Sequence, residues 1–151
     1  MTRSNRKKIF ISYSRKDKKK LDELKIMLKG AFQDEVIQIW DDSKILPGEN
    51  WEEIINKALS ITKVTILLVT KNFIASDFIM KNELPFFLNM AKKGLIKIGW
   101  IYWGYCNYEE TGLNRFQALN DVSQPLDKLS KPEREAKLSE IVYKVYLMRE
   151  E

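Results

Sequence analysis

The sequence predicts an α/β fold in which a parallel sheet carries helices on both faces. Runs typical of strands alternate along the chain with runs of helical spacing, an order that is typical of parallel sheets. The run Val64–Val69 is apolar almost throughout, which indicates a strand covered on both faces. The chain has 151 residues, close to the commonest domain size, so we expect one domain over residues 1–151.

The first strand is expected at Lys8–Tyr13, preceded by a basic tail at residues 1–7. Ser14 and Asp17 have the spacing of a capping box, so a helix is expected to begin there. The apolar stripe expected to bury this helix consists of Leu21, Leu24, Ile26, Met27, Leu28 and Phe32.

A second strand and a second helix are expected in the next part of the chain. The strand is Val36–Trp40, and Asp41–Glu49 is predicted to be a loop because it contains the pair Pro47-Gly48. Asn50 and Glu53 are then expected to cap a helix.

The strand Val64–Val69 is followed by an expected helix at Asp77–Lys92 and an expected strand at Leu95–Trp103. Gly104–Lys128 is irregular, with a short fifth strand near Arg115–Leu119. The last helix is expected from Ser130, Pro132 and Glu133, which form a capping box with proline in the first turn, to about Met148. Its expected buried residues are Leu138, Ile141, Val142, Val145 and Tyr146.

The composition excludes several classes of chemistry. The chain has no histidine, which excludes His-based triads and zinc sites that need imidazole. The single cysteine, Cys106, cannot form an internal disulfide and is expected to be a small buried side chain. The net charge of +5 is concentrated in Arg3–Lys8 and Arg15–Lys20. These clusters either attract phosphate or are solvated surface, and nucleic-acid binding is disfavoured because no aromatic residues interleave with them.

The chain is expected to be a cytoplasmic protein with no membrane contact. No apolar run reaches the roughly 18 residues that span a bilayer. The basic N-terminus precedes an apolar segment too short for a signal peptide, and no small-residue cleavage site follows it.

A ligand crevice is expected where the first strand ends. Ligands of open parallel sheets bind beyond the carboxyl ends of the strands, and Ser12-Tyr13-Ser14-Arg15 occupies that place. Hydroxyl and guanidinium groups suit phosphate or ribose, although Ser14 as a helix cap and Arg15 as a surface residue explain the motif equally well. Neither the glycine-rich dinucleotide motif nor the phosphate-binding loop of nucleotide triphosphatases is present.

Glu83 is the candidate acidic residue. It lies at the margin of a buried helical stripe, and Pro85 puts it in or near the first turn of the regular helix. Partial burial raises the pKa of a carboxyl group there, while the helix N-terminus favours its anion. The alternative is an ordinary charge of a first helical turn. The stripe consists of Met80, Leu84, Phe87, Leu88 and Ala91.

The loop Asp41–Glu49 is interpreted as either a mobile lid or a protein-contact loop. Asp41 and Asp42 are adjacent carboxylates with no evident third ligand, so we expect no metal site.

Together these motifs resemble the Toll/interleukin-1 receptor (TIR) domain family, in its bacterial or archaeal form. The resemblance covers Lys8 to about Val145 and rests on the order and spacing of its pieces. The matching pieces are Ile9–Ser14 with Asp17, Trp40-Asp41-Asp42 through Lys44, Ile45, Pro47 and Gly48 to Trp51, Leu68–Phe78 with Glu83-Leu84-Pro85, and Phe116–Asn120 with Pro125-Leu126.

The resemblance implies a flavodoxin-like fold with a five-stranded parallel sheet in the order 2-1-3-4-5. It also implies cleavage of NAD as substrate, with no further cofactor, to nicotinamide and linear or cyclic ADP-ribose, in defence signalling. Glu83 falls at the catalytic position of the NAD-cleaving members. An aromatic residue commonly stands four places before that glutamate, where this chain has Ile79 with Phe78 one place earlier.

Nicotinamide is a cationic leaving group that needs no acid, so one carboxylate beside the ribose suffices to stabilise the oxocarbenium-like transition state. On this hypothesis the substrate is held by Phe10, Ser12, Tyr13, Ser14, Arg15, Asp41, Lys44 and Phe78. The residues expected to contact other TIR or receptor domains are Asp42, Ser43, Ile45, Leu46, Pro47 and Gly48.

The alternative function is that of a non-catalytic module that pairs TIR domains through this loop. A flavin protein or phospho-acceptor of flavodoxin-like fold is disfavoured, because the first strand lacks an acidic pair and no phosphate cradle follows it.

Overall fold

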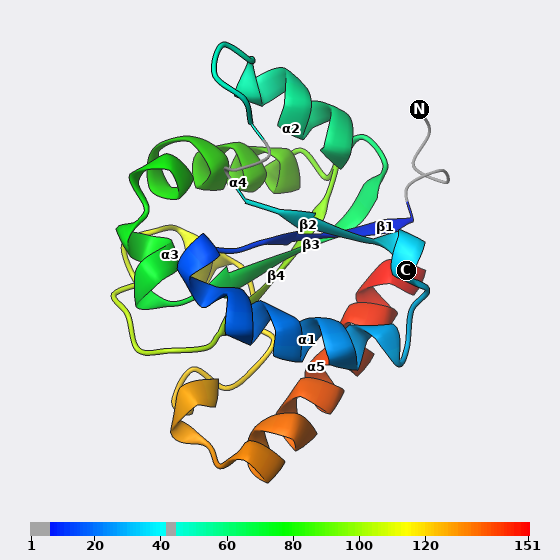
Figure 1. Cartoon of the computed structure of the whole chain (residues 1–151), viewed down its shortest axis with the longest axis vertical. Coiled ribbons are helices and arrows are strands. Elements are labelled where there is room, and N and C mark those ends of the chain that lie inside the picture. The colour runs from blue at the N-terminus through cyan, green and yellow to red at the C-terminus, as the bar shows by residue number, and fades with distance from the viewer. Residues whose placement is uncertain (1–6, 42–44) are drawn as a thin grey trace.

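The computed structural model describes residues 7–41 and 45–151, which form a parallel sheet between two layers of helices (Figure 1). The sheet has the order β2-β1-β3-β4, and every neighbouring pair is parallel. This confirms the predicted α/β class and the predicted order of the first four strands. The strands are β1 (Lys8–Ser12), β2 (Ile37–Trp40), β3 (Thr62–Val69) and β4 (Lys97–Tyr102).

The predicted fifth strand is wrong in extent, because only a single bridge between Ala118 and Trp100 forms in that place. The side chain of Asn120 continues the pairing instead: its Oδ1 accepts from the Tyr102 N–H at 2.8 Å, and its Nδ2 donates to the Tyr102 carbonyl at 2.9 Å. A side-chain amide therefore satisfies the outer edge of β4, where a backbone strand was expected. Leu119 packs closely against Gly99: a Cβ atom on residue 99 would lie 2.9 Å from the Cδ1 atom of Leu119.

Helices α1 (Lys18–Lys29) and α5 (Lys131–Glu150) cover one face of the sheet, and α2 (Trp51–Leu59) and α4 (Leu84–Lys92) cover the other (Figure 1). The side chains of β1 alternate between the two cores, with Ile9 and Ile11 towards α1 and α5 and Phe10 towards α2 and α4. The ligand crevice expected after the first strand therefore lies at the end of a strand that is packed on both sides.

The predicted caps of two helices are confirmed. Asn50 Oδ1 accepts from the N–H groups of Glu52 and Glu53 at the start of α2. Ser130 and Glu133 form the reciprocal capping box of α5, which runs two residues beyond the predicted end.

The prediction differs from the structure in three places. Ile26 is 71% exposed, because the buried stripe of α1 follows Leu21, Leu24 and Leu28 and Ile26 falls outside it. Tyr146 is also exposed rather than buried, and Cys106 is only half-buried.

A short helix that the sequence analysis missed, α3 (Lys71–Ala75), follows β3. It begins at Thr70, whose hydroxyl accepts from the Phe73 N–H. Within the described residues, no helix has the length and apolarity needed to cross a membrane.

Candidate functional site

The turn after β1 is built around two polar side chains. Ser14 accepts a hydrogen bond from the Lys16 N–H at 3.4 Å and so caps a 3-10 turn at Arg15–Asp17 that leads into α1. Asp17 does not complete the predicted capping box, because its carboxylate turns inward and is almost fully buried. The turn therefore leaves Arg15 and Lys16 exposed while Asp17 anchors it.

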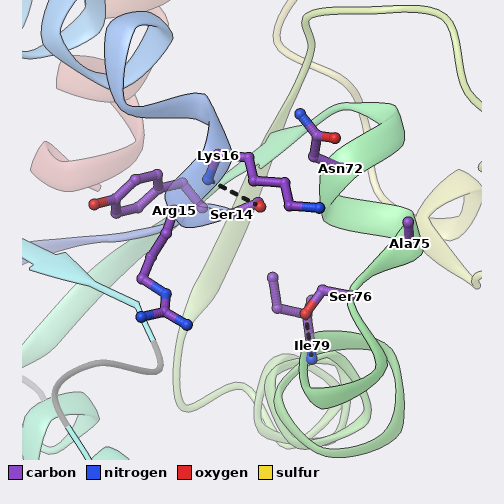
Figure 2. Close-up of a pocket in the computed structure, with 8 residues that line it drawn as sticks. Ser14, Arg15, Lys16, Asn72, Ala75, Ser76 and Ile79 are labelled. Atoms are coloured by element: carbon purple, nitrogen blue, oxygen red, sulfur yellow. Dashed lines mark hydrogen bonds between the residues drawn. The ribbon is translucent and has the colours of Figure 1, made fainter.

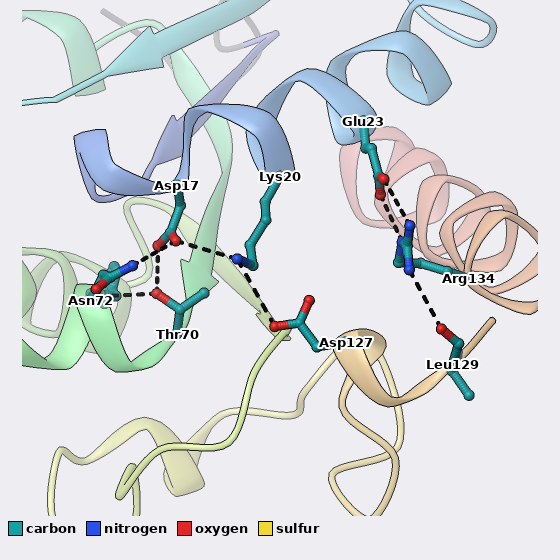
Figure 3. Close-up of polar contacts among 9 residues, drawn as sticks. Asp17, Lys20, Glu23, Thr70, Asn72, Asp127, Leu129 and Arg134 are labelled. Atoms are coloured by element: carbon teal, nitrogen blue, oxygen red, sulfur yellow. Dashed lines mark hydrogen bonds and ion pairs between the residues drawn. The ribbon is translucent and has the colours of Figure 1, made fainter. Parts of the chain in front are cut away.

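Asp17 joins the turn after β1 to the turn after β3 (Figure 3). The Thr70 hydroxyl donates to Asp17 Oδ2, and Asn72 Nδ2 donates to Asp17 Oδ1 at 2.9 Å. Lys20 Nζ lies 3.6 Å from the same carboxylate. These donors satisfy a buried charge and fix the two turns relative to each other.

A cavity of about 210 Å³ opens between the turn after β1, helix α3 and the start of the helical segment that begins at Ile79 (Figure 2). Lys16 extends from the first turn towards α3, and Arg15 leaves the same turn in another direction (Figure 2). The cavity is smaller than the roughly 300–1,000 Å³ of sites that enclose a drug-sized ligand. Its lining residues are Tyr13, Ser14, Arg15, Lys16, Asn72, Ala75, Ser76 and Ile79.

The helix that carries Glu83 is irregular. Ile79–Glu83 forms a π-helical segment, in which the N–H of the next residue, Leu84, donates to the Ile79 carbonyl five residues back. Pro85 lacks an N–H, and its ring would clash with the carbonyl four residues earlier in a regular α-helix, so it favours this wide turn. Single π-helical turns inside α-helices are frequent at functional sites.

Glu83 lies at the carboxyl end of β1, on the α2 and α4 side of the sheet. Ser12, the last residue of β1, is fully buried and its hydroxyl donates to Glu83 Oε1 at 3.2 Å. Glu83 is 1% exposed and is not among the described residues that line the cavity. Ile79 lies one turn earlier on the same helix and does line it. Glu83 is therefore one helical turn away from the cavity, beneath its surface.

The two aromatic residues expected at the substrate have different surroundings. Phe10 lies in the core, with ring-centroid distances of 5.8 Å to Trp40 and 5.7 Å to Phe87. Phe78 is half-buried and its ring meets Trp51 edge-on at 5.8 Å. Phe10 is therefore a core residue of this structure and is not among the described residues that line the cavity.

Tyr13 and Asp41 form a buried pair next to the cavity. The Tyr13 hydroxyl donates to Asp41 Oδ2 at 2.9 Å. Burial, and then the hydrogen bond to this carboxylate, raise the pKa of Tyr13 to about 12. Tyr13 therefore stays protonated at neutral pH and serves as a hydrogen-bond donor.

The described part of the predicted contact loop ends in a tight turn. The Glu49 N–H donates to the Leu46 carbonyl at 3.0 Å, and Gly48 has φ 86°, as the third position of a type II turn after Pro47 requires. Leu46 is 64% exposed, whereas Ile45 packs partly against the core. The predictions for Asp42, Ser43 and Lys44 fall outside the described residues.

Several cavity residues were not predicted from the sequence. Asn72, Ala75, Ser76 and Ile79 come from α3 and the following turn, and α3 itself was not predicted. Thr70 standing three residues before Phe73 was the available signal, because a threonine before an apolar run is a typical helix start. Within the described residues, no group of three or more acidic or cysteine side chains is placed to hold a metal ion.

Comparison with known proteins identifies relatives of this chain. The family model described as "TIR domain" matches residues 9–141. An uncharacterized protein of Sinorhizobium fredii, y4lF, is 25% identical over 118 residues, which are 78% of this chain and 36% of that protein, so the chain spans about a third of that relative. A solved structure of the TIR domains of the activated Roq1 resistosome, which recognises the pathogen effector XopQ, has 17% identity and a TM-score of 0.47, and the match covers 90% of this chain and 83% of that chain.

Proposed function

The chain belongs to the TIR domain family, and we propose that it cleaves NAD at the nicotinamide–ribose bond with Glu83 as the catalytic residue. The observation that carries the proposal is the Ser12–Glu83 hydrogen bond, which holds a buried carboxylate at the carboxyl end of β1. Burying a carboxylate lowers the stability of a fold. Catalysis would account for a buried carboxylate at this position, because the TIR family includes NAD-cleaving enzymes.

In the proposed reaction the bond between nicotinamide and ribose C1′ breaks, and its electron pair leaves with nicotinamide. The positive charge that develops on the ribose is stabilised by the Glu83 carboxylate. Two unit charges about 4 Å apart at an effective dielectric constant of about 20 interact by about 4 kcal/mol, which corresponds to a rate factor of about 10³. A water oxygen then bonds to C1′ and releases its proton, giving ADP-ribose. In a cyclising reaction, a nucleophile of the substrate itself replaces water.

The side chains around the cavity have separate roles in this proposal. Arg15 and Lys16 are exposed cations at its rim and attract the pyrophosphate of the dinucleotide. Tyr13 donates its hydroxyl proton to Asp41 and contributes to the wall of the cavity. Ser12 contacts Glu83 rather than the substrate, so it is a positioning residue. Because Glu83 is almost fully buried, substrate reaches it only after the cavity wall at Ile79 moves.

The test is nicotinamide release from NAD by concentrated protein. We expect Glu83→Gln, which keeps the shape of the side chain, to reduce kcat by about 10²–10³, because the charge that stabilises the transition state is removed. Glu110→Gln is the matched control, since Glu110 is an exposed glutamate in the loop after β4. An inactive parent, or a folded Glu83→Gln protein that releases nicotinamide at the parent rate, contradicts the proposal.

A second candidate function, a module that pairs TIR domains, is favoured by the exposed Leu46 at the tip of the Pro47-Gly48 turn. In this case we expect Leu46→Ser to reduce self-association, measured by analytical ultracentrifugation, by several-fold. A parent that assembles but releases no nicotinamide in its assembled form favours this function over catalysis.

A further inference from the structure

Another cleft, of about 630 Å³, lies between α3 and the loop that follows β4. One wall is a single face of α3, with Lys71, Ile74 and Ala75 at helical spacing. The loop that forms the opposite wall runs past α3 in yellow-green (Figure 1). The volume is within the usual range for a small-molecule site, and the cleft shares only Ala75 with the cavity near Glu83. Tyr102 at the end of β4 also lines the cleft, together with the loop residues Tyr105, Cys106, Asn107 and Glu109.

Aromatic packing gives the loop wall a defined shape. The buried Tyr102 hydroxyl accepts from the Cys106 N–H at 3.3 Å and so holds the loop over the end of β4. Tyr108 packs against Trp100 and Tyr102, with ring-centroid distances of 5.0 Å to each. These contacts fix the backbone on both sides of Tyr105. A wall that is ordered before binding loses little conformational entropy when a ligand arrives.

Tyr105 presents its ring at the cleft. The side chain is 61% exposed, although the Tyr102 ring contacts it at a centroid distance of 6.3 Å and an interplanar angle of 86°. Lys128 Nζ lies over one face of the Tyr105 ring, 6.0 Å from its centroid. The exposed part of the Tyr105 ring offers a surface on which a planar ring of a ligand can stack.

The charged and polar side chains of the cleft restrict the ligand further. Lys71 on the α3 wall is a cation that can pair with an anionic group of a ligand, and Glu109 is the acidic residue of the same lining. Asn107 supplies an amide donor and acceptor of the kind that recognises the edge of a heterocycle. We propose that this cleft binds a nucleoside monophosphate, with its base stacked on Tyr105 and its phosphate at Lys71, at a site separate from the one proposed for NAD cleavage.

The single cysteine reports directly on occupancy of the cleft. Cys106 is half-buried in its wall, so a bound nucleotide shields the thiol from alkylation. The probe is AMP, and ribose 5-phosphate, which has the phosphate and sugar but no base, is the comparison ligand. We expect AMP to slow alkylation of Cys106 by iodoacetamide, and ribose 5-phosphate at the same concentration to have little effect.

Variants locate the binding site by isothermal titration calorimetry with AMP. Base–aromatic stacking is worth about 1–3 kcal/mol, so we expect Tyr105→Ala to weaken AMP binding by about five- to a hundredfold. Tyr105→Phe keeps the ring and should bind nearly as well as the parent. Tyr143→Ala is the matched control, because Tyr143 is 62% exposed on the remote helix α5.

Three results would overturn the proposal: no AMP binding by the folded parent, equal protection of Cys106 by ribose 5-phosphate, or unchanged AMP affinity in Tyr105→Ala. All measurements can be repeated in the Glu83→Gln protein, where no NAD turnover is expected. AMP binding there is independent of nicotinamide release, so failure of this proposal and failure of the proposed NAD cleavage are distinguishable.

Discussion

The buried carboxylates Asp17 and Glu83 lie near the carboxyl end of β1 on opposite sides of the sheet, and their surroundings differ. Asp17, on the α1 side, receives a hydrogen bond on each oxygen, from Thr70 and Asn72, with Lys20 beside it. Glu83, on the α4 side, receives a 3.2 Å hydrogen bond from Ser12 and ends a π-helical segment. The surroundings of Asp17 suit an anchor of the fold, whereas the irregular helix at Glu83 suits a functional group.

The same contrast extends across the two faces of the sheet. Towards α1 and α5 the strands present aliphatic side chains such as Ile9, Ile66 and Leu68. Towards α2 and α4 they also present polar ones, and Gln38 Oε1, Trp40 Nε1 and Thr65 Oγ1 are buried without a hydrogen-bond partner among the described residues. Each such atom costs about 1–3 kcal/mol. The face that carries Glu83 therefore holds buried polar atoms that the aliphatic face lacks among these strand residues.

The largest effect on stability is expected in the aliphatic core of the α1 face. Leu24→Ala should lower the free energy of unfolding by about 2–5 kcal/mol, because Leu24 is completely buried and leaves a cavity. Ile26→Ala on the same helix should change it by less than about 0.5 kcal/mol, since Ile26 is exposed. Urea unfolding measures both, and equal losses would contradict the assignment of the buried stripe.

Alkaline titration tests the Tyr13–Asp41 pair. The pKa of Tyr13 is raised from 10.0 to about 12 by burial and by Asp41, so the folded protein keeps this proton after the unfolded chain has lost it. The resulting stability is fully present below pH 10 and is lost as the pH rises to about 12, a change on the order of 2 kcal/mol. The difference in tyrosinate absorbance between the parent and Tyr13→Phe gives the pKa directly. A midpoint near 10 would refute the interpretation.

Asp17→Asn removes a buried negative charge, while the two groups that donate hydrogen bonds to it remain in place. The Thr70 hydroxyl and the Asn72 amide would then share a weaker acceptor, and we expect a loss of about 1–3 kcal/mol in the free energy of unfolding. Asp22→Asn breaks only the exposed pair with Lys18 and should cost less than about 1 kcal/mol. If the two variants unfold at the same urea concentration, Asp17 is not an anchor of the fold.

The smallest effect is a gain in stability on the α4 face. Thr65→Val replaces a buried hydroxyl that has no partner in the described structure, so we expect stabilisation of about 1 kcal/mol. Thr62→Val is the matched control on the same strand, and it should destabilise by about 1 kcal/mol because the Thr62 hydroxyl donates to the Ala58 carbonyl at 3.0 Å. Thermal unfolding of both variants decides the sign, and a loss in Thr65→Val would mean that its hydroxyl is satisfied.

Local patterns in the sequence were sufficient to predict the alternation of strands and helices and the caps at Asn50 and Ser130, because these depend on neighbouring residues. The order of the strands in the sheet was instead implied by the resemblance to TIR domains. Long-range partners were not predictable. Asp17 turns inward because Thr70 and Asn72, 53 and 55 residues away, donate to it, and no local motif indicates this. The edge of β4 is likewise closed by the Asn120 side chain, which a search for strand-like runs does not detect.

The same distinction applies to the candidate site. The place of Glu83 at the margin of a buried stripe was predicted from helical spacing and Pro85. The π-helical segment and the hydrogen bond to Ser12, 71 residues away, depend on how the helix packs on the sheet. The hypothesis drawn from the family resemblance included Phe10 as a substrate contact, and the structure packs Phe10 against Trp40 and Phe87 in the core.

The most direct test of the different roles of Glu83 and Asp17 measures two quantities in both Glu83→Gln and Asp17→Asn. These are the rate of nicotinamide release from NAD and the free energy of unfolding. We predict that Glu83→Gln lowers the rate of release by about 10²–10³ while its stability stays equal to or above that of the parent. We predict that Asp17→Asn is destabilised but active where it is folded. A destabilised Glu83→Gln protein that still releases nicotinamide would show that Glu83 serves the fold and that the two carboxylates do not differ in role.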